Sequence, residues 1–145
     1  MVCVDITDES VSLYKQEMKN WDWTGIDEVH FVHGFQLVKY TDTFYMVSYP
    51  QEDDHAEIEK SINEILGTLE KEIFIGKGAP KIVNEVLFST EPRSALVEYS
   101  DQNDIDEMVI GTRGKHGITG LFSSSFAEYM VRHAHCTLRV IREKK

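Results

Sequence analysis

Several features that mark other protein classes are scarce or missing in this sequence. Cysteine occurs only at Cys3 and Cys136, which argues against a disulfide-stabilised scaffold and fits a reducing compartment. Basic residues number 15 against 25 acidic ones, and the net charge of −10 disfavours a nucleic-acid-binding surface. No apolar run approaches membrane-spanning length, and no charged leader precedes an apolar segment. We therefore expect a cytoplasmic protein that has neither nucleic-acid nor membrane partners.

Motifs of the common nucleotide-dependent and hydrolytic enzymes are also missing. Gly114-Lys115 is followed by His116, so there is no phosphate loop of a Walker-type NTPase. No G-x-G-x-x-G follows the first expected strand, no G-x-S-x-G occurs, and the cysteines lack the pairing of a zinc site. Residues 5–10 lack the His-x-x-His or His-x-Gly-His signature of nucleotidyl transferases of related topology. The sequence thus offers no dedicated catalytic residue and no metal ligands.

What the sequence does contain is a regular alternation of short apolar runs and amphipathic helical patterns. This alternation predicts a parallel α/β sheet in one domain spanning residues 1–145. Thr7 and Thr90 are expected to cap helices, and residues 100–106 to form a polar loop. Residues 35–50 fit neither pattern clearly, and within them we interpret Phe44–Val47 as a short extra strand or hairpin arm. The expected strands are 1–5, 29–34, 81–88, 107–111 and 137–141; helices are expected over 9–20, from 51 to 73, after Thr90 and after Ser125.

Several conspicuous side chains have a structural interpretation. His30 and His33 are three residues apart in an expected strand, so they point to opposite faces and cannot chelate one metal ion. Trp21 and Trp23 lie in a turn and are expected to pack against a helix end. The acidic run 52–54 opens a helix, where acids suit the helix dipole, and we expect it to be a solvated face.

The most specific stretch is the connection between the strand that ends at Gly111 and the next helix. Its glycines at 111, 114, 117 and 120 leave little side-chain bulk in the loop. A strand, a loop of this kind and a helix bring backbone N–H groups to one point, where a phosphate can sit. Residues 123–125 are serines that can cap the helix and offer hydroxyls. Arg113, Lys115 and His116 could offset phosphate charge, although solvated loop residues are the preferred interpretation.

This stretch resembles the universal stress protein family. In the pattern G-x2-G-x9-G-[ST], Gly111, Gly114 and Ser125 match, and residues 128, 129 and 132–134 match the helix that follows. Two residues depart from it: Ser124 replaces the third glycine of the nucleotide-binding members, and Phe126 replaces a small aliphatic residue. The resemblance spans nearly the whole chain. It implies a Rossmann-like, adenine nucleotide alpha hydrolase-like fold: a five-stranded parallel sheet of order 3-2-1-4-5 with about two helices on each face.

The resemblance also implies an adenine-nucleotide site between the first and fourth strands, where the strand order reverses. Asp5 stands at the position of the aspartate that contacts adenosine, although a simple turn residue is an equally favoured interpretation. Gly34 stands where the family's backbone bonds the adenine edge. The implied cofactor is ATP or another adenine nucleotide with Mg²⁺, hydrolysed at most slowly. The expected binding residues are Cys3, Val4, Asp5, Gly34, Ile110, Gly111, Arg113, Gly114, Ser124, Ser125 and Phe126.

Two functions remain open at this point. One is an adenine-nucleotide-binding module in stress response or signalling, and the other is a nucleotide-free dimeric interaction protein of the same fold. Ser124 and Phe126 discriminate between them; a serine that must adopt a positive φ costs on the order of 1 kcal/mol, so we predict weak but specific binding. A metabolic enzyme of generic α/β fold lacks a catalytic group to support it.

A homodimer is expected in either case. The last strand, Thr137–Ile141, is short, apolar and at the sheet edge in the implied order. Its unpaired N–H and C=O groups invite the same strand of a second copy across a two-fold axis.

Overall fold

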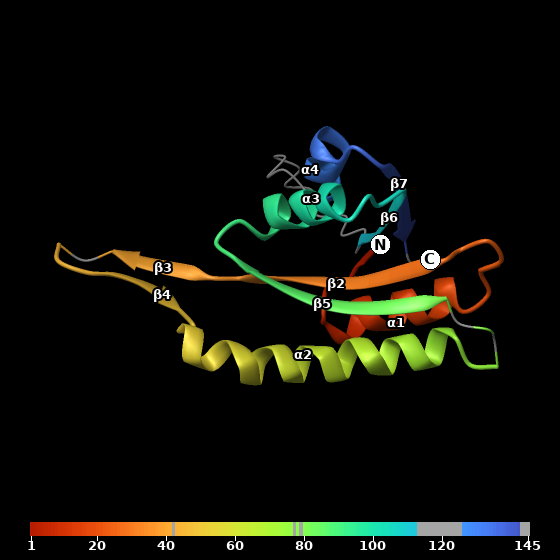
Figure 1. Cartoon of the computed structure of the whole chain (residues 1–145), viewed down its shortest axis with the longest axis horizontal. Helices are drawn as coiled ribbons and strands as arrows, with labels where there is room; N and C mark the ends of the chain where they lie inside the picture. Colours follow the sequence, from red (N-terminus) through yellow and green to blue (C-terminus); the bar gives the residue numbers. More distant parts are fainter. Residues whose placement is uncertain (42, 77, 79, 113–125, 143–145) are drawn as a thin grey trace, which may run out of the picture.

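The main sheet of the protein is parallel throughout. A computed structural model describes residues 1–41, 43–76, 78, 80–112 and 126–142. The five strands of this sheet lie in the order β5-β2-β1-β6-β7, and every neighbouring pair is parallel. Counted within this sheet alone, the order is third, second, first, fourth, fifth, as expected from the sequence (Figure 1). The strands are β1 (Val2–Cys3), β2 (Glu28–Gln36), β5 (Lys81–Ser89), β6 (Glu107–Thr112) and β7 (Thr137–Arg142).

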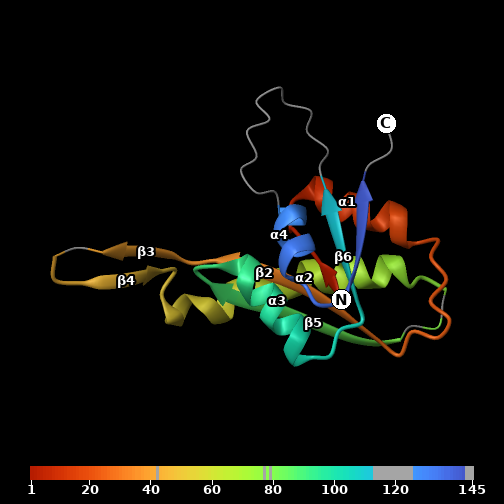
Figure 2. The ribbon, with the colours of Figure 1, turned by 90° about the horizontal axis from the view of Figure 1, so that it is seen from above.

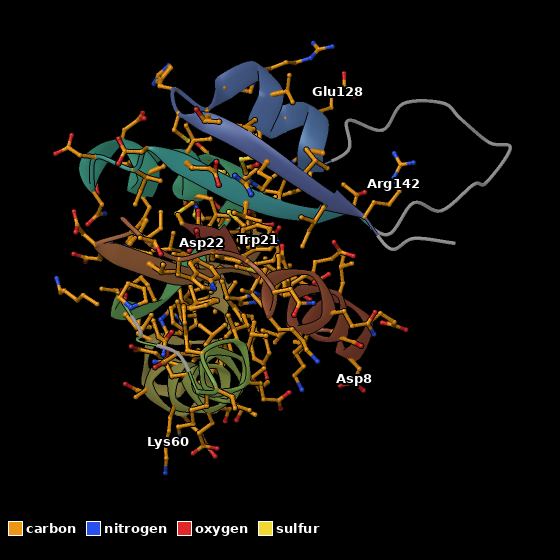
Figure 3. The ribbon with its side chains drawn as sticks, turned by 90° about the vertical axis from the view of Figure 1, so that its right-hand side faces the viewer. Asp8, Trp21, Asp22, Lys60, Glu128 and Arg142 are labelled. Atoms are coloured by element: carbon orange, nitrogen blue, oxygen red, sulfur yellow. The ribbon has the colours of Figure 1, made fainter. Side chains whose placement is uncertain are left out.

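Two helices cover each face of the sheet. Helices α1 (Asp8–Met18) and α2 (Glu52–Ile73) lie below it in the view of Figure 1, and α3 (Pro92–Gln102) and α4 (Phe126–His133) lie above it. Figure 3 shows the same layers end-on, with α2 and α4 on opposite sides. Each face has its own buried cluster, and β1 serves both because successive strand residues point to opposite faces. Val2 and Val4 join the cluster under α1 and α2, whereas Cys3 joins the one under α3 and α4.

Helix α2 shows how the pattern produces one of these layers. Its apolar residues recur at helical spacing, and Leu66 and Leu69 are completely buried against the sheet. Lys60 lies on the opposite side and points away from the body (Figure 3). The acidic first turn is largely exposed, as expected for a solvated face. Gly67 does not interrupt the helix, because packing of the apolar face outweighs one poor helix former.

Two expectations about the ends of α3 were wrong. Glu91, and not Thr90, is the N-cap residue of α3, because Pro92 takes the first helical position and fixes the start. The Ser89 hydroxyl accepts the Glu91 N–H at 3.0 Å and stabilises the turn before α3. Helix α3 also continues through Ser100 to Gln102, where a loop was expected; the buried Ser100 hydroxyl donates to the Val97 carbonyl, so the polar residue is satisfied within the helix. The expectation for Thr7 is confirmed, since it is the N-cap residue of α1, although its side chain makes no capping bond.

The segment that the sequence left unplaced is an antiparallel hairpin. Strands β3 (Val38–Thr41) and β4 (Met46–Tyr49) pair only with each other. The hairpin continues from the end of β2 and projects away from the body (Figures 1 and 2). Rings of Phe35 and His55 meet Phe88 at its base, at centroid distances of 5.2 and 4.1 Å. The interpretation of Phe44–Val47 as a hairpin arm is thus confirmed in part, because β4 begins at Met46.

The histidines and tryptophans have the structural roles that we expected. His30 contacts the Tyr99 hydroxyl at 2.8 Å and the Glu28 carboxylate at 2.9 Å. Trp23 packs against Phe74, the C-cap residue of α2, with ring centroids 4.9 Å apart. Among the described residues, no group of three or more side chains is arranged to hold a metal ion. None of the helices in the described part of the chain has the length and apolarity needed to cross a bilayer.

Candidate functional site

A cavity of about 630 Å³ lies at the carboxyl ends of β1, β2 and β6. Strand β1 is followed by α1 on one face of the sheet, whereas its neighbour β6 is followed by α4 on the other face. In open α/β sheets a crevice forms at such a point, and ligands bind there. Helix α1 and the first turns of α3 and α4 complete the wall. The lining residues are Cys3, Val4, Asp5, Glu9, Ser10, Leu13, Tyr14, Val32, His33, Gly34, Gln36, Pro92, Arg93, Leu96, Gly111, Thr112, Phe126 and Ala127.

Most of the described residues that the sequence singled out meet in this wall. They come from the end of β1, the end of β2, the end of β6 and the start of α4, namely Cys3, Val4, Asp5, Gly34, Gly111 and Phe126. Ile110 is the exception: it is completely buried in the core and is not part of the wall. Its neighbour Gly111 reaches the cavity because successive strand residues alternate in direction. Arg113, Gly114, Ser124 and Ser125 lie outside the described residues.

Gly34 contributes its backbone and its small size. The Val32 carbonyl accepts the Val4 N–H at 2.9 Å, so Val32 turns its backbone groups toward β1. Strand backbones repeat every two residues, so Gly34 turns its N–H and C=O to the same side, just beyond the end of β1 at Cys3. A Cβ on Gly34 would lie 3.0 Å from Pro92 Cβ and 3.2 Å from Leu96 Cδ1. The close approach of α3 therefore favours glycine here.

Tyr14 is a cavity residue whose role in the wall the sequence did not reveal. Its hydroxyl donates to the Cys3 carbonyl and accepts the Gly111 N–H at 2.7 Å, so one side chain from α1 joins the ends of β1 and β6. The ring is 1% exposed, and burial raises the pKa of the phenol well above its usual range. The helical spacing that predicted an inward face with Leu13, Tyr14 and Met18 was the available signal. It showed that Tyr14 is buried but not which backbone groups its hydroxyl meets.

The charged and polar side chains in the wall are few. Asp5 and Glu9 bring carboxylates, and Arg93 brings a cation, whose guanidinium also lies 5.1 Å from the centre of the Tyr129 ring. His33 donates its Nδ1–H to the Val4 carbonyl at 2.7 Å, since a carbonyl can only accept, and this bond fixes the ring at the end of β1. Burial raises the pKa of the Cys3 thiol to about 12, so this thiol stays protonated and unreactive at neutral pH.

The ring of Phe126 lines the cavity and does not fill it. The sequence raised the concern that a ring at this position fills part of a ligand pocket. In the structure Phe126 is partly buried at the start of α4, packed against the cluster that contains Met130. The cavity of about 630 Å³ exists with this ring in its wall, and its size lies within the range of small-molecule sites.

Comparison with known proteins agrees with this architecture. The model of the Universal stress protein family matches residues 1–142 of the chain. The chain belongs to the universal stress protein family. A curated universal stress protein of Methanocaldococcus jannaschii is 34% identical over 65 residues, which are 45% of this chain. The match spans only 38% of that relative's own length.

Solved structures of the family share the fold at low sequence identity. One is a universal stress protein in complex with cAMP, 17% identical, with a TM-score of 0.65 over 97% of this chain and 94% of that chain. Another is the universal stress protein from Archaeoglobus fulgidus in complex with dAMP, 18% identical, with a TM-score of 0.57 over 97% of this chain and 94% of that chain. At these identities the likeness establishes the five-stranded α/β fold.

Proposed function

We propose that this universal stress protein binds an adenine nucleotide in the cavity between β1 and β6 and acts as a stress-response or signalling module. The observation that carries the proposal is the convergence of Asp5, Gly34 and Gly111 at one open cavity from three separate strands. Asp5 offers a carboxylate to a ribose hydroxyl, and the Gly34 backbone offers one donor and one acceptor to an adenine edge. The two structural relatives solved with cAMP and dAMP support this ligand class, since both ligands contain adenine and phosphate.

The phosphates would lie toward the loop that begins after β6. Gly111 and Thr112, the last described residues before that loop, both line the cavity, and Arg93 is the cation in the described wall. Arg113, Gly114, Ser124 and Ser125 belong to this proposal as phosphate ligands, as the family motif implies. Because the chain carries a net charge of −10, attraction of an anionic ligand must come from such local groups and not from the overall field.

ATP with Mg²⁺ is the proposed physiological form of the ligand. Mg²⁺ is commonly held by substrate phosphates, water and one or two carboxylates, so a cage made only of protein side chains is not required. Asp5 and Glu9 are the carboxylates of the described wall that could hold the ion or its waters. The ion would neutralise phosphate charge there. We propose no catalytic residue, and hydrolysis is expected to be slow.

Calorimetric titration tests this proposal directly. ATP with Mg²⁺, titrated into the wild-type chain, should give weak saturable heat, and AMP should compete for the same site. Asp5→Ala should abolish most of the heat, whereas Asp8→Ala, which removes the same charge from a residue outside the wall, should not. Ser124→Gly should strengthen binding up to about tenfold, equivalent to about 1.4 kcal/mol.

The absence of heat from both the wild type and Ser124→Gly would defeat the nucleotide proposal. A nucleotide-free dimeric interaction protein of the same fold would then be the remaining function. The cavity would in that case be a feature inherited with the fold, without a ligand.

We also propose a cytoplasmic homodimer that forms through β7. This strand is at the edge of the sheet, and Val140 is 48% exposed there. Antiparallel pairing of two β7 strands would satisfy their free backbone groups. Val140→Lys should weaken this pairing, and the mass in solution by light scattering measures the effect.

A further inference from the structure

The projecting hairpin has one entirely apolar face. In its register, Val38 pairs with Tyr49 and Tyr40 pairs with Val47. Directly opposite residues of an antiparallel pair share a face, and alternate residues along a strand share a face, so all four side chains lie on the same side. They are 41–64% exposed. The opposite face carries Lys39, Thr41, Met46 and Ser48.

A hairpin face of this kind is expected to pack against a partner. An isolated two-stranded hairpin is marginally stable in water and needs packing on its apolar side. Tyr40, Tyr49, Phe44 and Tyr45 are 61–85% exposed. At about 200 Å² per aromatic side chain, the two tyrosines of the face present roughly 250 Å² per copy, and Phe44 and Tyr45 at the tip of the arm add roughly 300 Å², against the ~800 Å² that each partner buries in a standard interface. We propose that the arm, residues 38–49, is a dimerisation element whose partner is the same arm of a second copy.

The arrangement of the four side chains fits a second copy in particular. The two valines occupy one diagonal of the face and the two tyrosines occupy the other. When two such faces stack about a two-fold axis that runs across the strands, Val38 of one copy meets Tyr40 of the other, and Val47 meets Tyr49. Every large side chain then faces a small one, which is the condition for interdigitated packing of two layers.

The charge distribution of the chain also favours a second copy as the partner, stacked about the same axis. The chain has a net charge of −10, whereas residues 35–50 contain only Lys39 and Asp42 as charged residues. Two copies can therefore meet at the arms with little repulsion. With the axis across the strands the arms overlap in opposite directions, which keeps the acidic bodies at the two far ends. A single lysine is too little cationic charge for an anionic membrane or a nucleic acid, whose protein partners carry clustered Lys and Arg.

The test must separate this interface from the proposed pairing of β7. Sedimentation equilibrium is therefore measured in a Val140→Lys background, where β7 pairing is weakened. The arms should still form a dimer with a micromolar dissociation constant. In this background Tyr40→Thr combined with Tyr49→Thr should raise that constant by at least about tenfold for each tyrosine, while threonine preserves the strands. The matched control, Lys39→Thr combined with Ser48→Thr on the opposite face, should leave it unchanged.

A size exchange then tests the packing itself. Val38→Tyr alone places a tyrosine against a tyrosine and should weaken the dimer by about tenfold or more. Adding Tyr40→Val restores a large side chain against a small one and should recover the wild-type constant. Circular dichroism and nucleotide titration of each variant check that the body is intact.

Three results would overturn the inference. They are a Val140→Lys variant that is monomeric throughout the micromolar range, a control pair that dissociates as the tyrosine pair does, and a size exchange that fails to recover association. Binding to phosphatidylserine vesicles that depends on Tyr40 and Tyr49 in a monomeric chain would assign the arm to a membrane and would also overturn it.

Discussion

The cavity and the arm are joined by β2, and they differ in the contacts that their residues make. Strand β2 contributes Gly34 to the cavity wall and then runs through Gln36 toward the arm, which starts at Val38. At Gly34 the chain is enclosed: a single added carbon would lie 3.0 Å from Pro92. At Tyr40, six residues later, the side chain is 64% exposed, and Lys39 and Thr41 on either side are also exposed.

This difference predicts how each region responds to change. Around the cavity, a substitution disturbs buried neighbours, so its effect on a ligand is mixed with an effect on folding. In the arm, a substitution removes contacts that only a second molecule can supply. Variants of the first region should change the free energy of unfolding, and variants of the second should change association alone.

The largest change in stability should come from ionisation of the Cys3 thiol in the cavity wall. Its folded-state pKa is about 12 because burial disfavours the thiolate, whereas the unfolded thiol ionises near its ordinary pKa of 9.0. Between these values the unfolded state binds fewer protons, so stability falls as pH rises, by about 1.4 kcal/mol per pH unit for one group. Below pH 9 this contribution is fully present.

Urea unfolding at pH 9, 10 and 11, compared between wild type and Cys3→Ala, measures this slope. The variant should lack the alkaline loss, so the difference between the two proteins should shrink as pH rises. Cys136→Ala is the matched comparison: burial also raises the pKa of that thiol, but the thiol is only partly buried, so a smaller alkaline loss is expected there. Parallel slopes for wild type and Cys3→Ala would refute the assignment.

Tyr14→Phe should destabilise the chain by about 2 kcal/mol, because it leaves the buried Cys3 carbonyl and Gly111 N–H without their shared partner. Chemical denaturation at pH 7 gives the value. Tyr99→Phe removes the hydroxyl that meets His30 at a partly buried site and should cost less. No loss of stability in Tyr14→Phe would mean that the bridge between β1 and β6 adds nothing.

Gly34→Ala should cost about 1–2 kcal/mol, because Pro92 and Leu96 at the start of α3 must move to make room. The same movement should weaken nucleotide binding. Thermal unfolding and calorimetry on one preparation give both effects. An alanine tolerated without loss would show that α3 is not held tightly against β2.

Gly67→Ala should act in the opposite direction. This glycine is inside α2, and a Cβ there would meet no atom within 4 Å. Alanine should therefore stabilise the chain by about 0.5–1 kcal/mol through helix propensity. An increase in the midpoint of thermal unfolding, with unchanged nucleotide binding, is the expected result. A decrease would indicate a contact on that side of α2 in solution.

The smallest effect on folding should come from the arm. Tyr40→Thr should change the unfolding free energy of the monomeric body by less than about 0.5 kcal/mol, since the ring contacts solvent on the exposed face. Denaturation of the Val140→Lys protein at low concentration, where it is monomeric, provides the measurement. A larger loss would mean that the arm packs on its own body.

The sequence by itself determined the alternation of strands and helices, the parallel sheet and part of the described cavity wall. Apolar periodicity marks strands and helices because each must bury one face, and Asp5, Gly34 and Gly111 lie at or just beyond the carboxyl ends of strands that meet at one edge. Local signals misled at α3, where Thr90 has a good capping side chain but Pro92 sets the start of the helix.

Only the tertiary structure decided what depends on contacts between distant residues. The bridge from Tyr14 to Cys3 and Gly111 joins positions 11 and 97 residues apart, and no local pattern specifies where a buried hydroxyl will find its partners. The preference for glycine at position 34 arises from the approach of α3. The apolar face of the arm arises from the pairing of Val38 with Tyr49, since a shift of one residue would divide the same side chains between two faces. Periodicity is local and can be read from the chain, whereas register and packing depend on which segments meet.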